Sequence, residues 1–180
     1  TDLSVLPDET QIPKLQYVMQ CMKEALRLWP VGPGFQVRPL EDEVLAGKYQ
    51  LKKGQPVLIL TPQVQRNPEL FPDPESFDPD RFSPELEAQR PAWSWMPFGS
   101  GERACIGRHF SFYESQLLLG LILQRFKLID EPEYELDIKD FFSIKPIDLQ
   151  MRIEPRPGQE QAVMSGIGRA GTTPEDDSAT

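Results

Sequence analysis

The feature that most constrains this 180-residue chain is a glycine-rich run at residues 98–107, FGSGERACIG, which places one cysteine just before a long apolar stretch. Gly99 and Gly101 permit the tight, partly positive-φ path of a turn. The apolar stretch is long enough to form a buried helix, so we expect turn and helix together to cover about residues 97–125. A helix N-terminus provides partial positive charge and free N–H groups, which favour a thiolate over a thiol at Cys105.

The residues around Cys105 suit a haem iron with a thiolate ligand, which pushes electron density onto the iron and favours O–O cleavage. Gly107 leaves no Cβ where a porphyrin face would lie. Arg103 is a permanent cation that can pair with a haem propionate, and Phe98 can shield the sulfur from water. The same residues also fit a small buried cysteine in a strand–turn–helix unit.

The run resembles the haem-binding signature of the cytochrome P450 family, FxxGxRxCxG, at every specified position. The resemblance implies that Cys105 is the axial ligand of haem b and that Arg103 contacts a propionate. It implies no catalytic residue in this chain beyond the haem ligand. The residues expected to bind the cofactor through this run are Phe98, Gly99, Gly101, Arg103, Cys105 and Gly107.

A second motif lies on the first predicted helix, where Glu24 and Arg27 stand three residues apart, opposite an apolar stripe. The residue types alone fit a surface ion pair between neighbouring turns. However, residues 23–30, KEALRLWP, resemble the family's ExxR helix, and residues 77–82, FDPDRF, resemble its meander. The resemblance implies a buried structural triad of Glu24, Arg27 and Arg81, which is costly to break because each survivor is an unpaired buried charge.

Two single positions are expected from the same resemblance. Arg38 lies where family members place a second propionate contact, and its alternative role is an exposed strand arginine. Phe35 lies in a segment that lines the family's substrate pocket, and its alternative role is ordinary core.

The resemblance covers about residues 12–153 and implies an α+β, mainly helical fold, the C-terminal, proximal-haem part of the P450 domain. Periodicity predicts a helix that starts at Pro13 and ends near Trp29. A short strand is expected at Phe35–Val37, a buried strand at 56–60, and turns at Gly47 and Gly54. The other expected elements are short helices near 64–66 and 84–89 and closing strands at 126–130, 134–136, 141–145 and 148–154.

The chain divides by composition into residues 1–154, the haem-domain part, and residues 155–180, a flexible acidic tail or interdomain linker. Residues 24–30, 103–107 and 134–139 look most like the self-sufficient fatty-acid hydroxylases. That resemblance implies insertion of one oxygen atom from O2 into a small apolar substrate such as a fatty acid. The electrons would come from NADPH through the FAD and FMN of a reductase domain, fused or separate.

No stretch matches the family's oxygen-activating helix, so we expect a fragment that lacks the N-terminal part of the haem domain. Relatives that isomerise or dehydrate peroxides share the same proximal loop and stay open at this point. Two other readings are a non-catalytic remnant or interaction module without haem, and an enzyme with a cysteine nucleophile. For the last, Cys105 and His109 are spaced i,i+4 but lack a third orienting group.

Composition excludes several other classes. The net charge is −9 and no basic cluster alternates with aromatic residues, so nucleic acid is not an expected partner. Two cysteines and one histidine cannot form a four-ligand Cys/His zinc site. The acidic residues of 73–80 lack the glycine of an EF-hand loop, and no GxGxxG or Walker loop is present for NADPH or flavin. The longest apolar run, 117–123, is too short to span a bilayer. We expect a reducing, cytoplasmic location.

Overall fold

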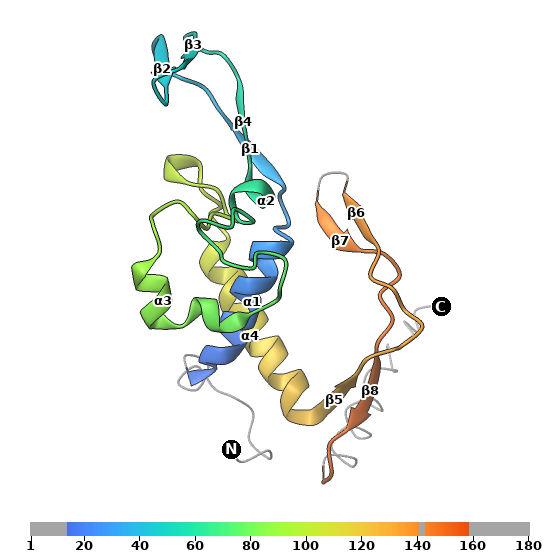
Figure 1. Cartoon of the computed structure of the whole chain (residues 1–180). Coiled ribbons are helices and arrows are strands. Elements are labelled where there is room, and N and C mark those ends of the chain that lie inside the picture. The colour runs from blue at the N-terminus through green and yellow to red at the C-terminus, as the bar shows by residue number, and fades with distance from the viewer. Residues whose placement is uncertain (1–13, 141–142, 159–180) are drawn as a thin grey trace, which may run out of the picture.

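Two long helices lie at the centre of the computed structural model, which describes residues 14–140 and 143–158. Helix α1 (Gln16–Leu28) packs against helix α4 (Arg108–Arg125) (Figure 1). The two helices approach closely at Gly120, because a Cβ there would lie only 2.7 Å from Leu15 Cδ1. Helix α1 ends as predicted, just before Trp29, where Pro30 cannot continue a helix. The expected start at Pro13 lies outside the described residues.

Within the described residues, the strands form four separate antiparallel pairs. The two strands expected near Phe35–Val37 and 56–60 are present as β1 (Gly34–Val37) and β4 (Val57–Leu60). They pair with each other, which places Phe35 opposite Ile59. Beyond this ladder lies the hairpin of β2 (Glu43–Leu45) and β3 (Tyr49–Leu51), which projects away from the helices (Figure 1). The other pairs are β5 (Phe126–Ile129) with β8 (Arg152–Pro155), and β6 (Ile138–Asp140) with β7 (Ile144–Pro146).

The irregular segment between β4 and α4, called the meander from here on, contains short helices. They are α2 (Thr61–Val64), η2 (Pro79–Phe82), α3 (Pro84–Gln89) and η3 (Gly101–Arg103). Helix α3 has the predicted bounds, because Ser83 accepts a hydrogen bond from the Leu86 amide and Pro84 opens the first turn. Helix α2 starts three residues before the expected short helix, because Pro62 favours the first turn of a helix.

Several predicted strands are shifted. Residues 134–136 are not a strand, because the Tyr134 amide closes a turn onto the Glu131 carbonyl, and β6 begins only at Ile138. The strand expected at 148–154 begins at Arg152, since Asp148 has a φ of +46° that a strand cannot contain. Of the strand expected at 141–145, residues 141–142 lie outside the described residues and the rest overlaps β7. The turns at Gly47 and Gly54 have the expected positive φ, +71° and +75°.

The hydrophobic core is small. Among the described residues it consists of Leu28, Phe71, Phe82 and Phe112. The expectation of a buried strand at 56–60 is wrong in this chain, since Leu58 is 60% exposed. The expectation of a long buried helix is also wrong: α4 buries only Phe112 and Gln116, and Leu118 is 51% exposed. Both errors have one cause, which is that no described element covers these apolar faces.

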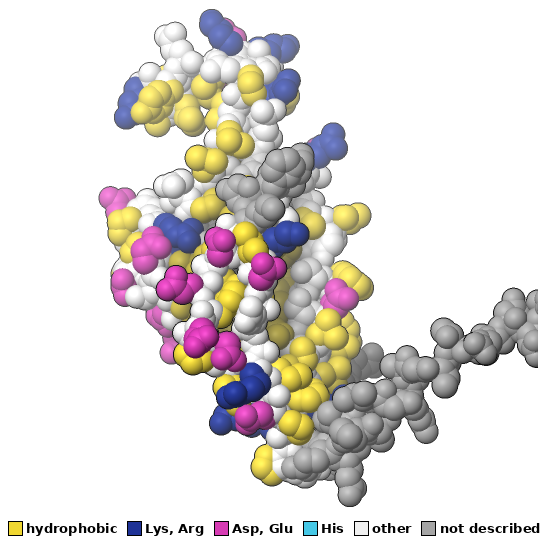
Figure 2. Space-filling view, turned by 90° about the vertical axis from the view of Figure 1, so that its right-hand side faces the viewer, with side chains coloured by type: hydrophobic (Ala, Val, Ile, Leu, Met, Phe, Trp, Pro, Cys, Tyr) yellow, Lys and Arg dark blue, Asp and Glu magenta, His cyan; other side chains and the backbone are white. Residues whose placement is uncertain are grey.

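Figure 2 shows hydrophobic side chains spread over much of one face, from the β2–β3 end downwards, with acidic side chains gathered in its middle. Such broad apolar exposure is unusual for an isolated soluble domain and typical of a surface that another part of a protein covers. None of the helices that the structure describes is long and apolar enough to cross a membrane.

Candidate functional site

An ion pair inside the molecule joins Glu24 and Arg27, which stand on the same face of α1. Arg27 Nε donates to Glu24 Oε2 at 2.7 Å, and Arg27 Nη2 donates to Glu24 Oε1 at 2.8 Å. Both side chains are 0% exposed. The alternative of a surface ion pair is therefore wrong, because this pair is bidentate and has no access to solvent.

The meander supplies the rest of the pair's hydrogen bonds. Arg27 donates to the carbonyl oxygens of Gln65, Pro74 and Ser76 at 3.0, 2.7 and 3.1 Å. The Asp78 amide donates to Glu24 Oε1 at 2.8 Å. Every charge-bearing atom of the pair thus has partners, which is the condition under which a buried ion pair is tolerated.

Arg81, the third residue expected in the triad, lies on η2 beside this pair. Its Nε is 3.4 Å from Glu24 Oε1, although this buried nitrogen makes no hydrogen bond in the described structure. Its Nη1 and Nη2 donate to the carbonyls of Pro72 and Asp73 at 2.5 and 2.8 Å. Arg81 therefore attracts the Glu24 carboxylate of α1 electrostatically. It also holds two parts of the meander together through its hydrogen bonds to the Pro72 and Asp73 carbonyls.

Sequence reasoning missed two members of this network. Gln65 is fully buried, donates to the Leu26 and Arg27 carbonyls at 3.0 Å, and accepts from the Met96 amide at 2.8 Å. It thereby links α1 to the segment that enters the glycine-rich turn. Arg90 donates to the Arg81 carbonyl. A glutamine and an arginine without a motif carry no local signal, so neither was detectable from the sequence.

The glycine-rich run forms the predicted turn. Gly99 and Gly101 have φ values of +69° and +67°, a region that other residues enter only with strain. The Cys105 amide donates to the Phe98 carbonyl at 2.8 Å and closes the loop. Helix α4 begins at Arg108. In its first turn the Ser111 amide donates to the Gly107 carbonyl at 2.8 Å.

The loop presents the Cys105 side chain to solvent. Cys105 is exposed, so the alternative of a small buried cysteine is wrong. A Cβ at Gly107 would lie 3.7 Å from Cys105 Sγ, so a side chain there would stand against the sulfur. Arg103 is also exposed and makes no hydrogen bond or ion pair with the described residues. Phe98 packs edge-on against Phe112, with ring centroids 5.2 Å apart.

The two weaker candidates lie away from this loop in the sequence. Arg38 follows β1, is exposed, and donates from Nη2 to Gln36 Oε1 at 3.2 Å. Phe35 is half-buried on β1. Within the part of the chain that the structure describes, neither residue has a hydrogen bond, ion pair or ring contact with the cysteine loop.

The acidic side chains of residues 73–80 have other partners. Asp73 accepts from the Ser76 hydroxyl, Glu75 pairs with Arg66 at 3.2 Å, and Asp78 accepts from the Asp80 amide at 3.1 Å. Across residues 14–140 and 143–158, no group of three or more His, Cys, Asp or Glu is arranged to hold a metal ion. His109, the partner of Cys105 in the nucleophile reading, is exposed.

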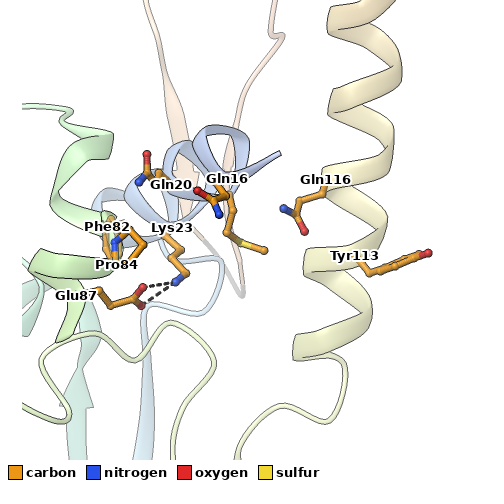
Figure 3. Close-up of a pocket in the computed structure, with 9 residues that line it drawn as sticks. Gln16, Gln20, Lys23, Phe82, Pro84, Glu87, Tyr113 and Gln116 are labelled. Carbon is orange, nitrogen blue, oxygen red and sulfur yellow. Dashed lines mark hydrogen bonds and ion pairs between the residues drawn. The ribbon is translucent and has the colours of Figure 1, made fainter. Parts of the chain in front are cut away.

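A pocket of about 330 Å³ opens between α1, α3 and α4 (Figure 3). On one wall Lys23 pairs with Glu87 at 2.6 Å, and on the other Tyr113 and Gln116 project from α4. A second pocket of about 260 Å³ lies between α1 and the β6–β7 pair. None of the predicted site residues lines either pocket.

The surroundings of the sulfur fit a flat apolar group with anionic edges that binds through a thiolate. The sulfur is accessible and has a glycine beside it. Ile106 is fully exposed and Phe110 is 70% exposed, so the start of α4 offers apolar surface without a covering element among the described residues. The unpaired Arg103 is a suitable partner for a carboxylate.

Comparisons with known proteins agree with this geometry. The sequence model of the family described as Cytochrome P450 matches residues 4–152. The chain is 42% identical over 151 residues to bifunctional cytochrome P450/NADPH–P450 reductase 2 of Bacillus subtilis (strain 168), covering 83% of this chain and 14% of that protein. It is 44% identical over 154 residues to self-sufficient cytochrome P450 monooxygenase CYP505E5 of Aspergillus niger, covering 84% and 15%.

The fold is similar to that of solved haem domains. The crystal structure of the cytochrome P450DA heme domain matches with a TM-score of 0.82 and 39% sequence identity, over 86% of this chain and 34% of that chain. The crystal structure of a cytochrome P450 named CYP102L1 matches with a TM-score of 0.78 and 38% identity, over 84% of this chain and 35% of that chain. The chain therefore spans a third of a haem domain and a seventh of the length of the curated relatives.

Proposed function

Because the chain belongs to the cytochrome P450 family, we propose that it forms the proximal part of a haem-thiolate monooxygenase with Cys105 as the axial ligand of haem b. When bound in such an enzyme, the haem supplies the chemistry that inserts one oxygen atom from O2 into a C–H bond. The observation that carries the proposal is the exposed Cys105 sulfur in a loop closed by two positive-φ glycines at the start of α4.

The residues of this chain would hold the cofactor in distinct ways. Cys105 would bind the iron through its sulfur, from a loop that ends at the start of α4. Gly107 keeps the space beside the sulfur open, and the free guanidinium of Arg103 binds a propionate, with Arg38 as a second such contact. Phe98 is fixed by Phe112, which allows it to exclude water from the sulfur. The Glu24–Arg27–Arg81 triad holds the meander that leads into the loop and takes no part in chemistry.

The names of the relatives suggest the source of electrons. One relative is a bifunctional P450 and NADPH–P450 reductase, and another is a self-sufficient monooxygenase. We therefore propose that electrons reach the site from NADPH through a reductase domain that carries FAD and FMN, and that residues 155–180 begin a linker towards it. A fatty acid is the proposed substrate, with Phe35 in its pocket. Two free thiols are consistent with a cytoplasmic location.

The exposed apolar faces of α4 and of the β1–β4 ladder support a larger haem domain. The chain matches 34% of a solved haem-domain chain, and apolar surface of this extent is usually covered. We propose that the remainder of such a domain covers these faces and provides the oxygen-activating helix and most of the substrate channel.

A spectrum of the chain reconstituted with haem, reduced and exposed to carbon monoxide, tests the ligand. We expect the red-shifted Soret band of a thiolate-ligated haem in the unchanged chain and in Cys21→Ala, the matched control cysteine. We expect its loss in Cys105→Ala, with an unchanged far-UV circular dichroism spectrum because the Cys105 side chain is exposed. A thiolate band that persists in Cys105→Ala would overturn the assignment. No haem uptake by the unchanged chain would favour the second candidate, a remnant or interaction module, which the exposed apolar faces also suit.

A further inference from the structure

Arg90 occupies an unusual position for a cation. Its guanidinium carbon lies 4.9 Å from the centroid of the Phe71 ring and 4.5 Å from that of Phe82, so that it stands between two buried aromatic rings. It makes no ion pair with a carboxylate in the described structure, and burial lowers its pKa from the ordinary arginine value. Its hydrogen bond goes to the Arg81 carbonyl. A half-buried arginine with this environment contributes by stacking and by fixing a backbone oxygen.

Each of the two rings makes a further contact, Phe71 with a guanidinium and Phe82 with another aromatic ring. On one side Phe71 also contacts the Arg27 guanidinium, at 5.3 Å. On the other side Phe82 meets Trp95 edge-on at 5.5 Å, Trp95 stacks on Phe112 at 6.3 Å, and Phe112 meets Phe98 at 5.2 Å. One unbroken series of ring contacts therefore runs from the buried ion pair of α1 to the first residue of the cysteine loop.

This series contains three of the four buried hydrophobic residues of the described structure, Phe71, Phe82 and Phe112. Arg90 is the member of this series that lies between the first two rings. Helix α1 also reaches the loop side through Gln65, which accepts from the Met96 amide at 2.8 Å, and through Trp95, whose Nε1 donates to the Lys23 carbonyl at 3.2 Å. Because packed aromatic and guanidinium groups have few alternative arrangements, such a contact series moves as a unit.

We infer that Arg90 is a positioning residue that makes the triad and the cysteine loop one cooperative unit, which opens and closes together. The inference rests on the proposed function in one respect, which is that the cysteine loop is the loop proposed to bind haem. Two amides report the ends of the unit: the Asp78 amide, which donates to Glu24, and the Cys105 amide, which donates to the Phe98 carbonyl.

Amide hydrogen exchange of the full chain, measured as a function of urea, tests this inference. We expect the Asp78 and Cys105 amides to exchange through one opening, with the same rate and the same urea dependence. In Arg90→Lys, which keeps the charge but loses the planar stack on both rings, both amides should exchange about tenfold faster. The matched control is Arg66→Lys, an arginine of the same segment whose partner Glu75 is mostly exposed.

The inference is overturned if the two amides of the unchanged chain open separately, or if only one of them responds to Arg90→Lys. It is also overturned if the amides of the β1–β4 ladder accelerate equally, because that result indicates general destabilisation. If Arg90→Lys does not fold, the inference is decided by whether the Asp78 and Cys105 amides of the unchanged chain exchange through one opening. In the haem-loaded chain, the fraction with the thiolate Soret band should fall in Arg90→Lys and not in Arg66→Lys. Absence of haem uptake counts against the proposed function, whereas the exchange result still decides the role of Arg90.

Discussion

Replacing Glu24 by alanine is the sharpest test of how this protein is held together. The change removes a carboxylate that accepts three hydrogen bonds, two from Arg27 and one from the Asp78 amide, and that also faces Arg81 at 3.4 Å. Arg27 would keep its three carbonyl partners but lose the carboxylate with which it pairs in the described structure, at a site with 0% exposure. A buried charge left without its partner is strongly destabilising.

The expected loss of unfolding free energy is about 3–5 kcal/mol, as for other broken buried ion pairs. Domains of this kind have about 5–15 kcal/mol in total, and a core of four buried hydrophobic residues places this chain at the low end. With a urea slope of about 2 kcal/mol per molar, the unfolding midpoint should fall by about 2 M, or the protein should not fold.

Urea unfolding followed by circular dichroism measures the midpoint. The control is Glu75→Ala, whose partner Arg66 lies at 3.2 Å but whose own side chain is 72% exposed, so that its midpoint should move by no more than about 0.5 M. The reasoning would be refuted if Glu24→Ala shifted the midpoint no more than this control.

Two further predictions concern the strand ladder and the thiols. Gly34→Ala should destabilise the protein by about 1–3 kcal/mol, because the new Cβ would lie 2.5 Å from the Ile59 carbonyl oxygen, whereas Gly32→Ala meets nothing within 4 Å and should be neutral; equal unfolding midpoints for the two variants would contradict this. Cys105 should react quickly with Ellman's reagent at pH 8 and Cys21 slowly, since burial raises the pKa of the half-buried Cys21 thiol, and Cys105→Ala should leave only the slow phase. Because the folded state holds the Cys21 proton more tightly, its contribution to stability is complete below the unfolded thiol pKa of about 8.5 and falls as the pH rises above it. A single fast phase for both thiols would show that Cys21 is not protected.

Local chemistry made much of the fold predictable. Pro30 ends α1, Ser83 and Pro84 start α3, and the glycines at 47, 54, 99 and 101 adopt the positive φ that their turns need. Each of these outcomes depends on residues within one turn of the chain. The failures at residues 134–136 and 148–151 have a local cause as well, namely a turn and a positive-φ aspartate that alternating hydrophobicity does not reveal.

The candidate site was predictable to the extent that it follows a motif. Residue types and spacing placed Cys105 between a glycine turn and a helix, and the structure exposes its sulfur there. The partners of the ion pair were less accessible to sequence reasoning. The Gln65 carbonyl and the Ser76 carbonyl lie 38 and 49 residues from Arg27 in the chain, and backbone oxygens carry no sequence signature. Gln65 and Arg90 were missed for the same reason.

Short-range features of this protein follow directly from its residues: where helices stop, where the backbone turns through positive φ, and which cysteine stands before a helix. Tertiary structure alone decided whether Glu24 and Arg27 form an exposed pair or a buried one, since their spacing on α1 is identical in both cases. It also decided that the apolar faces of α4 and β4 stay exposed in this chain. The physical reason is that burial and the pairing of charges are properties of what packs against a side chain, and those neighbours come from distant segments of the chain.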